Sequence, residues 1–295
     1  EKFAQDNNIK ITRVEDGFIR SIGLGSDLTR PYSLAFDDVG IYFDPTQPSR
    51  LEEILNFTQF DFHIINEATQ LIKAIVNSGI SKYNNANDVS INIPSGKKSI
   101  LVVGQVEDDA SIKLGANSMT NLSLLKQVRV ENSDAVIVYK PHPDVVSGNR
   151  VGSVSSSDID LYSDLCLVDV GISELISKVD EVHTMTSLVG FEALLHGKAV
   201  VTYGMPFYAG WGLTKDKINC DRRTRKLSLL ELVAGALILY PRYIDPNSGH
   251  YCAAELLIDR LKQQRDRMGS SFLYRTQHNL HSFISRKSQK ILSWF

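Results

Sequence analysis

The alternation of apolar segments in the second half of the chain places the tightest limit on how this sequence can fold. From Ala135 onward, short β-branched runs alternate with amphipathic helical segments. These segments span residues 135–139, 181–184, 188–196, 199–203 and 228–240. Such a rhythm is typical of βαβ units, in which helices connect parallel strands and cover the sheet. We therefore predict an α/β fold with a parallel sheet.

A boundary between two domains is predicted just before residue 99. Residues 100–104 form an apolar run typical of a strand, and a helical stretch follows near 117–130. The preceding segment, 93–98, has the Pro, Gly and Lys content of an exposed connector. The predicted parts are an N-terminal Rossmann-like domain at 1–95, a second Rossmann-like domain at 99–245 and a C-terminal helical tail at 246–295.

The first region is predicted to contain short strands at 9–14 and 40–43 and helices at 50–56 and 63–78. Because the chain starts at Glu1 without a methionine, we expect the first strand of this domain to lie upstream. Two α/β halves would enclose a cleft, and ligands of open parallel sheets bind outside the carboxyl ends of the strands. Candidate site residues are therefore expected in the loops that follow strands.

Composition excludes several classes of protein. The formal net charge of −2, with both signs mixed along the 295 residues, disfavours nucleic acid as the partner. Cys166, Cys220 and Cys252 are far apart and have no metal-ligand spacing, which argues against a zinc site or a disulfide framework. The apolar run 229–240 is too short to cross a bilayer, and residues 1–20 lack a signal-peptide core. We expect a cytoplasmic protein.

Three adjacent acids follow the predicted strand that ends at Gly104. Glu107, Asp108 and Asp109 stand in the segment Gln105-Val-Glu-Asp-Asp-Ala-Ser111. In one interpretation this is a solvated loop in which Asp109 or Ser111 caps the next helix. In the other, one of the carboxylates is a nucleophile or a base.

Two further strand-end loops carry groups that suit a phosphate. In Tyr139-Lys-Pro-His-Pro143, the prolines fix the backbone around His142, and Lys140 stands beside it. The alternative is a turn histidine with a structural hydrogen bond. Thr186 and Ser187 directly precede the predicted helix 188–196, whose N-terminus is a natural anion site, although simple helix capping explains them as well.

Three other positions are candidates for sugar or ribose contacts. Glu192 lies in an otherwise apolar helix, where it is either partly exposed or bound to a ribose diol. The loop 203–213 mixes glycines with aromatic residues and suits either base or sugar packing or contact with the neighbouring domain. Arg20 suits a carboxylate or phosphate, or else an ion pair with Glu15 or Asp16. The nearby glycines at 23 and 25 do not match the dinucleotide fingerprint GxGxxG.

Taken together and in this order, these segments resemble the KpsC modules of Gram-negative capsule assembly. The resemblance lies within residues 14–245 and is carried by EDGFIRSIGLGS, DDVGIYFDP, QVEDDAS, KPHP and TSLVGFEALLHGK continuing into YGMPFYAGWGLT. It implies a GT-B fold, in which two Rossmann-like domains face each other across a cleft. It also implies transfer of β-Kdo, with retention, from CMP-β-Kdo to a lipid-linked Kdo primer built on lysophosphatidylglycerol, with no cofactor and no metal.

The resemblance also assigns roles to residues. It implies that Asp109 is catalytic and forms an aspartyl-Kdo adduct in a double displacement, with Asp108 as the alternative acid. His142 and Ser187 match phosphate contacts, His142 also acting in catalysis, and Glu192 matches the acid near the cytidine ribose. Arg20 and Ser21 resemble contacts on the sugar and acceptor side. The full set of expected donor-binding residues is Gln105, Ser111, Lys140, His142, Thr186, Ser187 and Glu192.

Two other functional classes remain open from the sequence. One is a different GT-B nucleotide-sugar enzyme, such as an inverting transferase or an epimerase. The other is a non-catalytic module that binds proteins of the capsule assembly complex. The basic and aromatic tail at 272–295 suits peripheral contact with an anionic inner membrane, which a lipid acceptor would require, or a helix that clasps the two halves.

Overall fold

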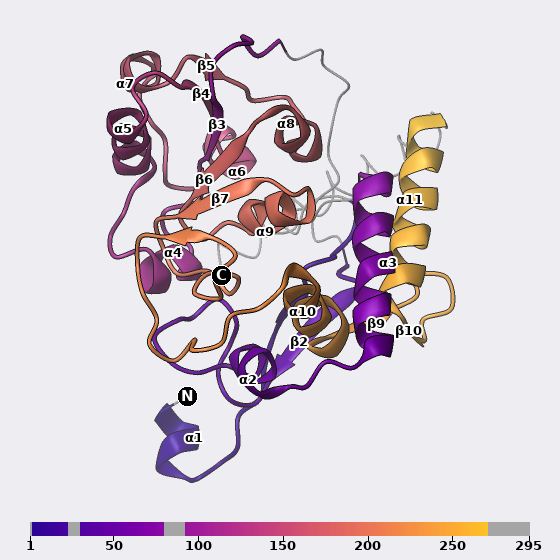
Figure 1. Ribbon diagram of the computed structural model, residues 1–295. Helices are drawn as coiled ribbons and strands as arrows, with labels where there is room; N and C mark the ends of the chain where they lie inside the picture. The colour runs from indigo at the N-terminus through magenta and orange to yellow at the C-terminus, as the bar shows by residue number, and fades with distance from the viewer. Residues whose placement is uncertain (1, 23–29, 80–91, 271–295) are drawn as a thin grey trace, which may run out of the picture.

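The computed structural model describes residues 2–22, 30–79 and 92–270. The described strands form a six-stranded sheet in the order β5-β4-β3-β6-β7-β8 and a four-stranded sheet in the order β1-β2-β9-β10. Figure 1 shows the six-stranded sheet above the four-stranded one, with α3 and α11 side by side along one flank. The predicted tail at 272–295 and the glycines at 23 and 25 lie outside the described residues.

The six-stranded sheet is parallel throughout, as the alternating pattern predicts. Its central strands are fully buried, because both faces are covered by helices. The strands are β3 (Ser99–Val103), β4 (Val136–Lys140), β5 (Leu165–Cys166), β6 (Glu181–Thr184), β7 (Ala199–Thr202) and β8 (Lys215–Asp216). The strands predicted near 100–104, 135–139, 181–184 and 199–203 are therefore confirmed.

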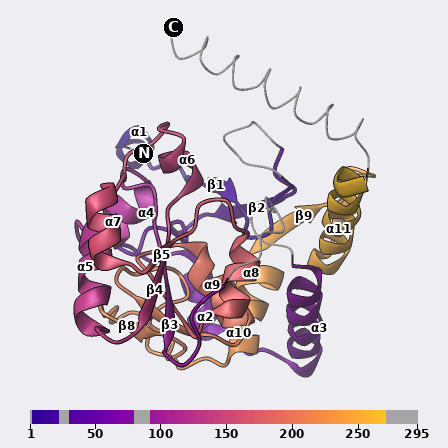
Figure 2. The same cartoon turned by 90° about the horizontal axis from the view of Figure 1, so that it is seen from above.

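Helices cover this sheet on two sides (Figure 2). Alternate residues of β3 point to opposite faces: Ile100 packs with α5 residues such as Leu124, and Leu101 packs with α8 and α9 residues such as Leu175. The connecting helices are α4 (Ala110–Gly115), α5 (Asn121–Glu131), α6 (Pro143–Val146), α7 (Ser156–Tyr162), α8 (Ile172–Lys178) and α9 (Leu188–Leu195). The topology places the loops after β3, β4 and β6 at one edge of the sheet.

The four-stranded sheet differs from the prediction for the first region. Its strands β1 (Arg13–Asp16), β2 (Ser33–Asp37), β9 (Pro241–Ile244) and β10 (Tyr251–Cys252) pair only in antiparallel fashion. A Rossmann-like domain has a parallel sheet, so the described part of 1–95 does not show one. This sheet also pairs β2 with β9, which lies more than two hundred positions later. The predicted division into three parts stays a prediction.

The expected strand at 40–43 is wrong, and β2 lies before it instead. The buried carboxylate of Asp37 accepts backbone N–H groups from Val39, Gly40 and Arg50, so the chain turns where an extended strand was expected. The remaining described helices are α1 (Lys2–Asp6), α2 (Arg50–Phe57), α3 (Phe62–Ser78), α10 (Leu229–Val233), the π-helix η2 (Ala234–Leu239) and α11 (Ala254–Ser270). Helices predicted at 50–56 and 63–78 are confirmed as α2 and α3.

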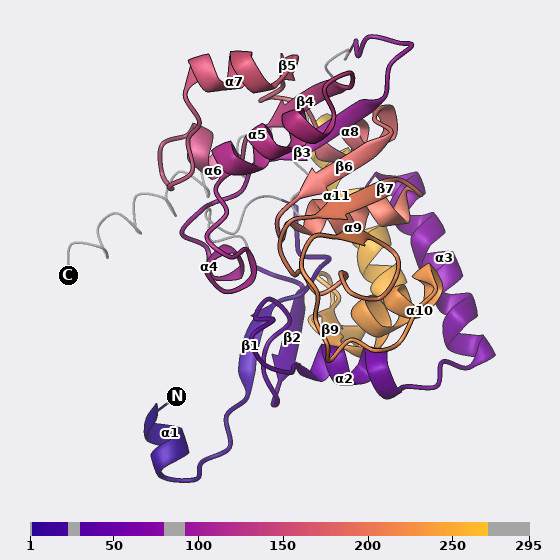
Figure 3. The ribbon, with the colours of Figure 1, turned by 60° about the vertical axis from the view of Figure 1, so that its left-hand side comes forward.

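The aromatic loop after β7 packs the two sheets against each other (Figure 3). Trp211 and Tyr208 are fully buried in it, and the ring of Phe207 stacks on Phe18 with a centroid distance of 4.3 Å. The hydroxyl of Tyr208 donates to the Ser187 backbone carbonyl at the start of α9. Packing against the neighbouring part of the chain, one of the two alternatives for this loop, is therefore realised.

A buried ion pair joins α2 to the segment after β8, and its loss should destabilise the fold. The carboxylate of Glu52 contacts Arg222 at 2.8 Å and the buried Arg223 at 3.1 Å. We expect Glu52→Gln to lower the free energy of unfolding by about 3 kcal/mol, because it leaves a buried guanidinium without its counter-charge. Urea denaturation measures this change. The matched control is Glu53→Gln, whose pair with Arg50 lies at the surface and should contribute little; equal effects would contradict the argument.

Candidate active site

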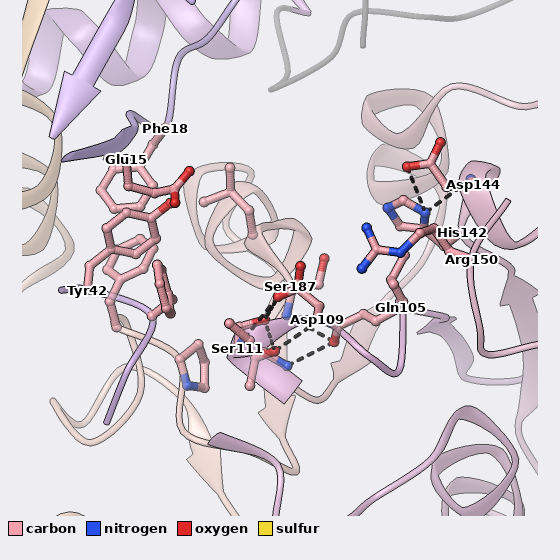
Figure 4. A pocket seen from close by; sticks show the side chains of 17 residues that line it. Glu15, Phe18, Tyr42, Gln105, Asp109, Ser111, His142, Asp144, Arg150 and Ser187 are labelled. Atoms are coloured by element: carbon pink, nitrogen blue, oxygen red, sulfur yellow. Dashed lines mark hydrogen bonds and ion pairs between the residues drawn. The ribbon is translucent and has the colours of Figure 1, made fainter. Parts of the chain in front are cut away.

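A cavity of about 350 Å³ lies where the loops after β3, β4 and β6 face the antiparallel sheet. Figure 4 shows Glu15, Phe18 and Tyr42 on one side, Asp109 and Ser111 in the middle, and His142 with Arg150 on the other side. The cavity is lined by Glu15, Phe18, Tyr42, Phe43, Gln105, Val106, Asp109, Ala110, Ser111, His142, Asp144, Arg150, Thr186, Ser187, Leu188, Pro206 and Phe207. The edge of the sheet expected to hold the site therefore does hold a cavity.

The three adjacent acids have three different partners. A Glu107 side-chain oxygen accepts the backbone N–H of Asn121 at 2.7 Å, at the start of α5. Asp108 forms an exposed ion pair with Arg150 at 3.0 Å. Asp109 is the one of the three that lines the cavity. The geometry therefore favours Asp109 over Asp108 for chemistry in this cavity.

Asp109 is both a helix cap and a cavity residue. Its Oδ1 accepts the backbone N–H of Ser111 at 2.9 Å and the Ser111 hydroxyl at 2.7 Å, as an N-cap of α4 does. No hydrogen bond within the described residues reaches its Oδ2. The capping interpretation is thus correct for Oδ1.

Within the described residues, a hydrogen bond reaches His142 Nδ1 and none reaches Nε2. The backbone N–H of Asp144 donates to His142 Nδ1 at 3.2 Å, where His142 is the N-cap of α6. In the neutral ring the proton therefore lies on Nε2, which can donate. Burial lowers the pKa of His142, although the carboxylates of Asp144 and Asp109 act to raise it. His142 is thus a neutral hydrogen-bond donor near pH 7.

The start of α9 is occupied by a side chain of the protein. Gln105 Oε1 accepts the backbone N–H groups of Thr186 at 2.9 Å and Ser187 at 3.1 Å. The Ser187 hydroxyl accepts from the N–H of Val189 at 3.2 Å, so it caps the helix. Two of the N–H groups expected to hold a phosphate are therefore already bonded to Gln105, although Thr186 and Ser187 both line the cavity.

Comparison with known proteins identifies the family. The model of the family described as "Capsule polysaccharide biosynthesis protein" matches residues 1–85 and 56–243. The chain belongs to this family. Two solved structures are similar to this chain, both from Thermosulfurimonas dismutans KpsC. The one described as beta Kdo 2,4 transferase has a TM-score of 0.80 and 36% identity, and the one described as beta Kdo 2,7 transferase has a TM-score of 0.75 and 42% identity. Each likeness covers 88% of this chain and 82% of the other. The chain is a KpsC-type module.

Curated relatives agree with this assignment. The capsule polysaccharide modification protein LipA of Neisseria meningitidis serogroup A is 49% identical over 274 residues, and the lipopolysaccharide-processing protein LpsZ of Rhizobium meliloti is 42% identical over 271 residues. The chain spans 39% of the length of LipA and 62% of the length of LpsZ.

Not every expected site residue of this capsule-family module reaches the cavity. Lys140 is buried, donates to the Val168 backbone carbonyl and is absent from the lining. Glu192 lies further along α9 and is likewise not a lining residue. Arg20 is buried in an ion pair with Asp16 at 2.5 Å, the alternative that the sequence left open. Direct donor contact by Lys140 and Glu192 therefore finds no support in the geometry of this cavity.

Ser21, the second residue expected on the sugar side, is also outside the lining. It is fully buried and accepts a hydrogen bond from Arg20 at 2.8 Å. Strand β1 and the bend after it instead contribute Glu15 and Phe18, which precede Arg20 in the same motif. Sequence reasoning considered Glu15 only as an ion-pair partner. In sequence nothing separates Glu15 from the adjacent Asp16, and its place in the cavity depends on the position of β1.

The described residues 2–22, 30–79 and 92–270 contain no cluster of three or more His, Cys, Asp or Glu side chains suited to a metal ion. Within the same residues, no helix has both the length and the apolar content that a membrane span needs.

Proposed function

We propose that this KpsC-type module is a retaining glycosyltransferase that moves Kdo from CMP-β-Kdo to a lipid-linked Kdo primer by double displacement. The observation that carries the proposal is that Asp109, His142 and Glu15 line one cavity and come from three separate segments. The likeness to KpsC Kdo transferase domains supports the choice of sugar. We further propose that the two sheets belong to the two halves of a GT-B fold, with the cavity in the cleft between them.

The first displacement would use Asp109 as nucleophile. Its Oδ2 attacks the anomeric carbon of Kdo, the bond from that carbon to the phosphate oxygen breaks, and CMP leaves with the electron pair. His142 Nε2–H donates a hydrogen bond to the phosphate, where negative charge develops. This step inverts the anomeric carbon and leaves Kdo esterified to Asp109. The proposal needs no cofactor and no metal ion.

The second displacement would use Glu15 as base. The acceptor hydroxyl of the primer attacks the anomeric carbon, the ester bond to Asp109 breaks, and Glu15 takes the hydroxyl proton. This step inverts the carbon again, so the configuration is retained overall. Glu15 supports this role because it is the carboxylate that the antiparallel sheet brings to the cavity, across from Asp109 (Figure 4).

Glu15→Gln should separate the two displacements. We expect the variant to form the Kdo adduct at close to the wild-type rate, because the first step needs no base, and to transfer Kdo to a primer analogue about 100-fold more slowly. Intact mass spectrometry follows the adduct, and chromatography of a fluorescent primer follows transfer. The control is Glu53→Gln, since Glu53 pairs with Arg50 at the surface and does not line the cavity. Equal loss of both steps in Glu15→Gln would contradict its assignment as base.

The experiment that tests the function itself is intact mass spectrometry of the wild-type module mixed with CMP-Kdo generated in place. We expect a mass increase equal to one Kdo residue, which a non-catalytic module or an epimerase would not show. CMP binding without an adduct and without transfer to any Kdo primer would overturn the proposed reaction.

The acceptor lipid also leads us to propose a site of action at the cytoplasmic side of the inner membrane, with proteins of capsule assembly as neighbours.

A further inference from the structure

A chain of side-chain hydrogen bonds runs from the start of α9 to the proposed nucleophile. Its first member is Gln105, whose Oε1 accepts two backbone N–H groups, those of Thr186 and Ser187. A backbone N–H can only donate, so these two bonds fix which end of the Gln105 amide is oxygen. The other end, Nε2, can then only donate, and it lies 3.0 Å from Thr186 Oγ1.

The direction of the remaining bonds follows from this fixed end. Because Thr186 Oγ1 accepts from Gln105, its own hydrogen is available for the Ser111 hydroxyl oxygen, 3.1 Å away. The Ser111 hydrogen in turn goes to Asp109 Oδ1 at 2.7 Å, since an ionised carboxylate only accepts. Every hydroxyl in the chain is thus both donor and acceptor, and every bond points toward Asp109.

The backbone under this chain is also held in place. Asn121 is buried, and its side chain accepts the N–H of Gln105 at 2.8 Å and donates to the Gln105 carbonyl at 2.7 Å. The same amide donates to the Gly152 carbonyl at 2.8 Å. The strand end that carries Gln105 is therefore fixed on both sides, as a rigid support for the chain requires.

We propose that Gln105, Thr186 and Ser111 are positioning residues that orient the Asp109 carboxylate for attack on the sugar. This inference rests on the proposed function. With two donors held on Oδ1, Oδ2 is the oxygen that forms the bond to the anomeric carbon. Cooperative polarisation along the chain also stabilises the negative charge when the second displacement restores the carboxylate.

This role differs from donor binding, which was the role expected for these residues from sequence. The hydrogens of Thr186 and Ser111 are both used inside the chain, and neither is left for a phosphate. Loss of these hydrogen bonds should therefore slow bond formation to Asp109 and leave the affinity for CMP unchanged. A donor-binding role predicts the opposite pattern.

Thr186→Val tests the proposal, because valine keeps the shape of threonine and removes the hydroxyl. We expect adduct formation at saturating CMP-Kdo to slow about 10-fold, with the Kd for CMP within about twofold of wild type. Thr186→Ser, which keeps the hydroxyl, should restore most of the rate. Ser111→Ala should also slow the step, and it keeps the test valid if the valine variant does not fold. The matched control is Thr69→Val, whose hydroxyl bonds only to its own helix α3.

The outcomes are distinguishable. A wild-type adduct rate in both Thr186→Val and Ser111→Ala would overturn the positioning role and leave the proposed function standing. Weaker CMP binding with an unchanged rate at saturation would also overturn it, because it would make these residues donor contacts. Absence of any adduct or transfer by the wild type would overturn the proposed function, and this inference with it.

Discussion

Asp109→Ala is expected to lower the rate of Kdo transfer by about 10⁴-fold or more, while CMP still binds. The expectation follows from the loss of the attacking oxygen, since removal of a nucleophile in other enzymes costs rate factors of this size or larger. Intact mass spectrometry should show no Kdo adduct on this variant. Isothermal titration with CMP should show an affinity close to that of the wild type, because the phosphate contact proposed for His142 is unchanged.

Two further variants separate chemistry from folding. Asp109 also caps α4, so its loss should cost about 1 kcal/mol of stability, and Asp109→Asn restores the capping oxygen without restoring the nucleophile. The Asn variant should therefore melt like the wild type and still fail to transfer Kdo. Asp108→Ala is the matched control, since Asp108 pairs with Arg150 at the surface. Normal turnover by Asp109→Ala, or an adduct that forms only when Asp108 is present, would contradict the assignment of Asp109 as nucleophile.

The parallel half of this molecule could be predicted from sequence because its signals are local. Strands buried on both faces, such as β3 and β4, read as short apolar runs, and α5 between them buries Leu124, Leu125 and Val128. The loops after these strands then had to meet at one edge of the sheet. Asp109, His142 and Ser187 were found together for this reason.

The antiparallel half could not be predicted in the same way. Its strands β1 and β2 are short and partly exposed, and the partner of β2 is β9, which lies far away in the sequence. No local pattern records such a pairing. The place of Glu15 in the cavity depends on this sheet, so sequence alone gave no reason to set Glu15 apart from Asp16.

Several pairs of alternative interpretations turned out to be compatible. Asp109 caps a helix with one oxygen, and the other oxygen is available in the cavity. Ser187 caps α9, and it also lines the cavity. From sequence, the two roles of such a residue look like alternatives, because the sequence names only the residue. The structure shows that different atoms of one side chain can have different roles. Lys140 shows the reverse case, since its position beside His142 in sequence does not bring its ammonium group to the cavity.

His142→Ala is expected to weaken both CMP binding and transfer, with kcat/KM for CMP-Kdo reduced by about 10³-fold. The proposed donor, Nε2–H, contacts the phosphate in the bound donor and more strongly as charge develops on departing CMP, so both binding and rate should suffer. Steady-state kinetics and CMP titration measure the two effects. His142→Gln should recover part of the loss, because its side-chain amide can place an N–H near the position of Nε2.

The pH dependence provides a second test of the same residue. Burial lowers the pKa of His142 below its ordinary 6.5, so the neutral ring predominates above that pH. As the pH falls through the lowered pKa, a proton must enter at Nδ1, where it meets the Asp144 N–H and breaks the cap of α6. We therefore expect wild-type kcat/KM to be level above about pH 6.5 and to fall below it, with a weaker fall in His142→Gln. Wild-type activity that declines as the pH rises from 6 to 7.5 would mean that His142 acts as a cation, contrary to the donor role argued from its Nδ1 contact.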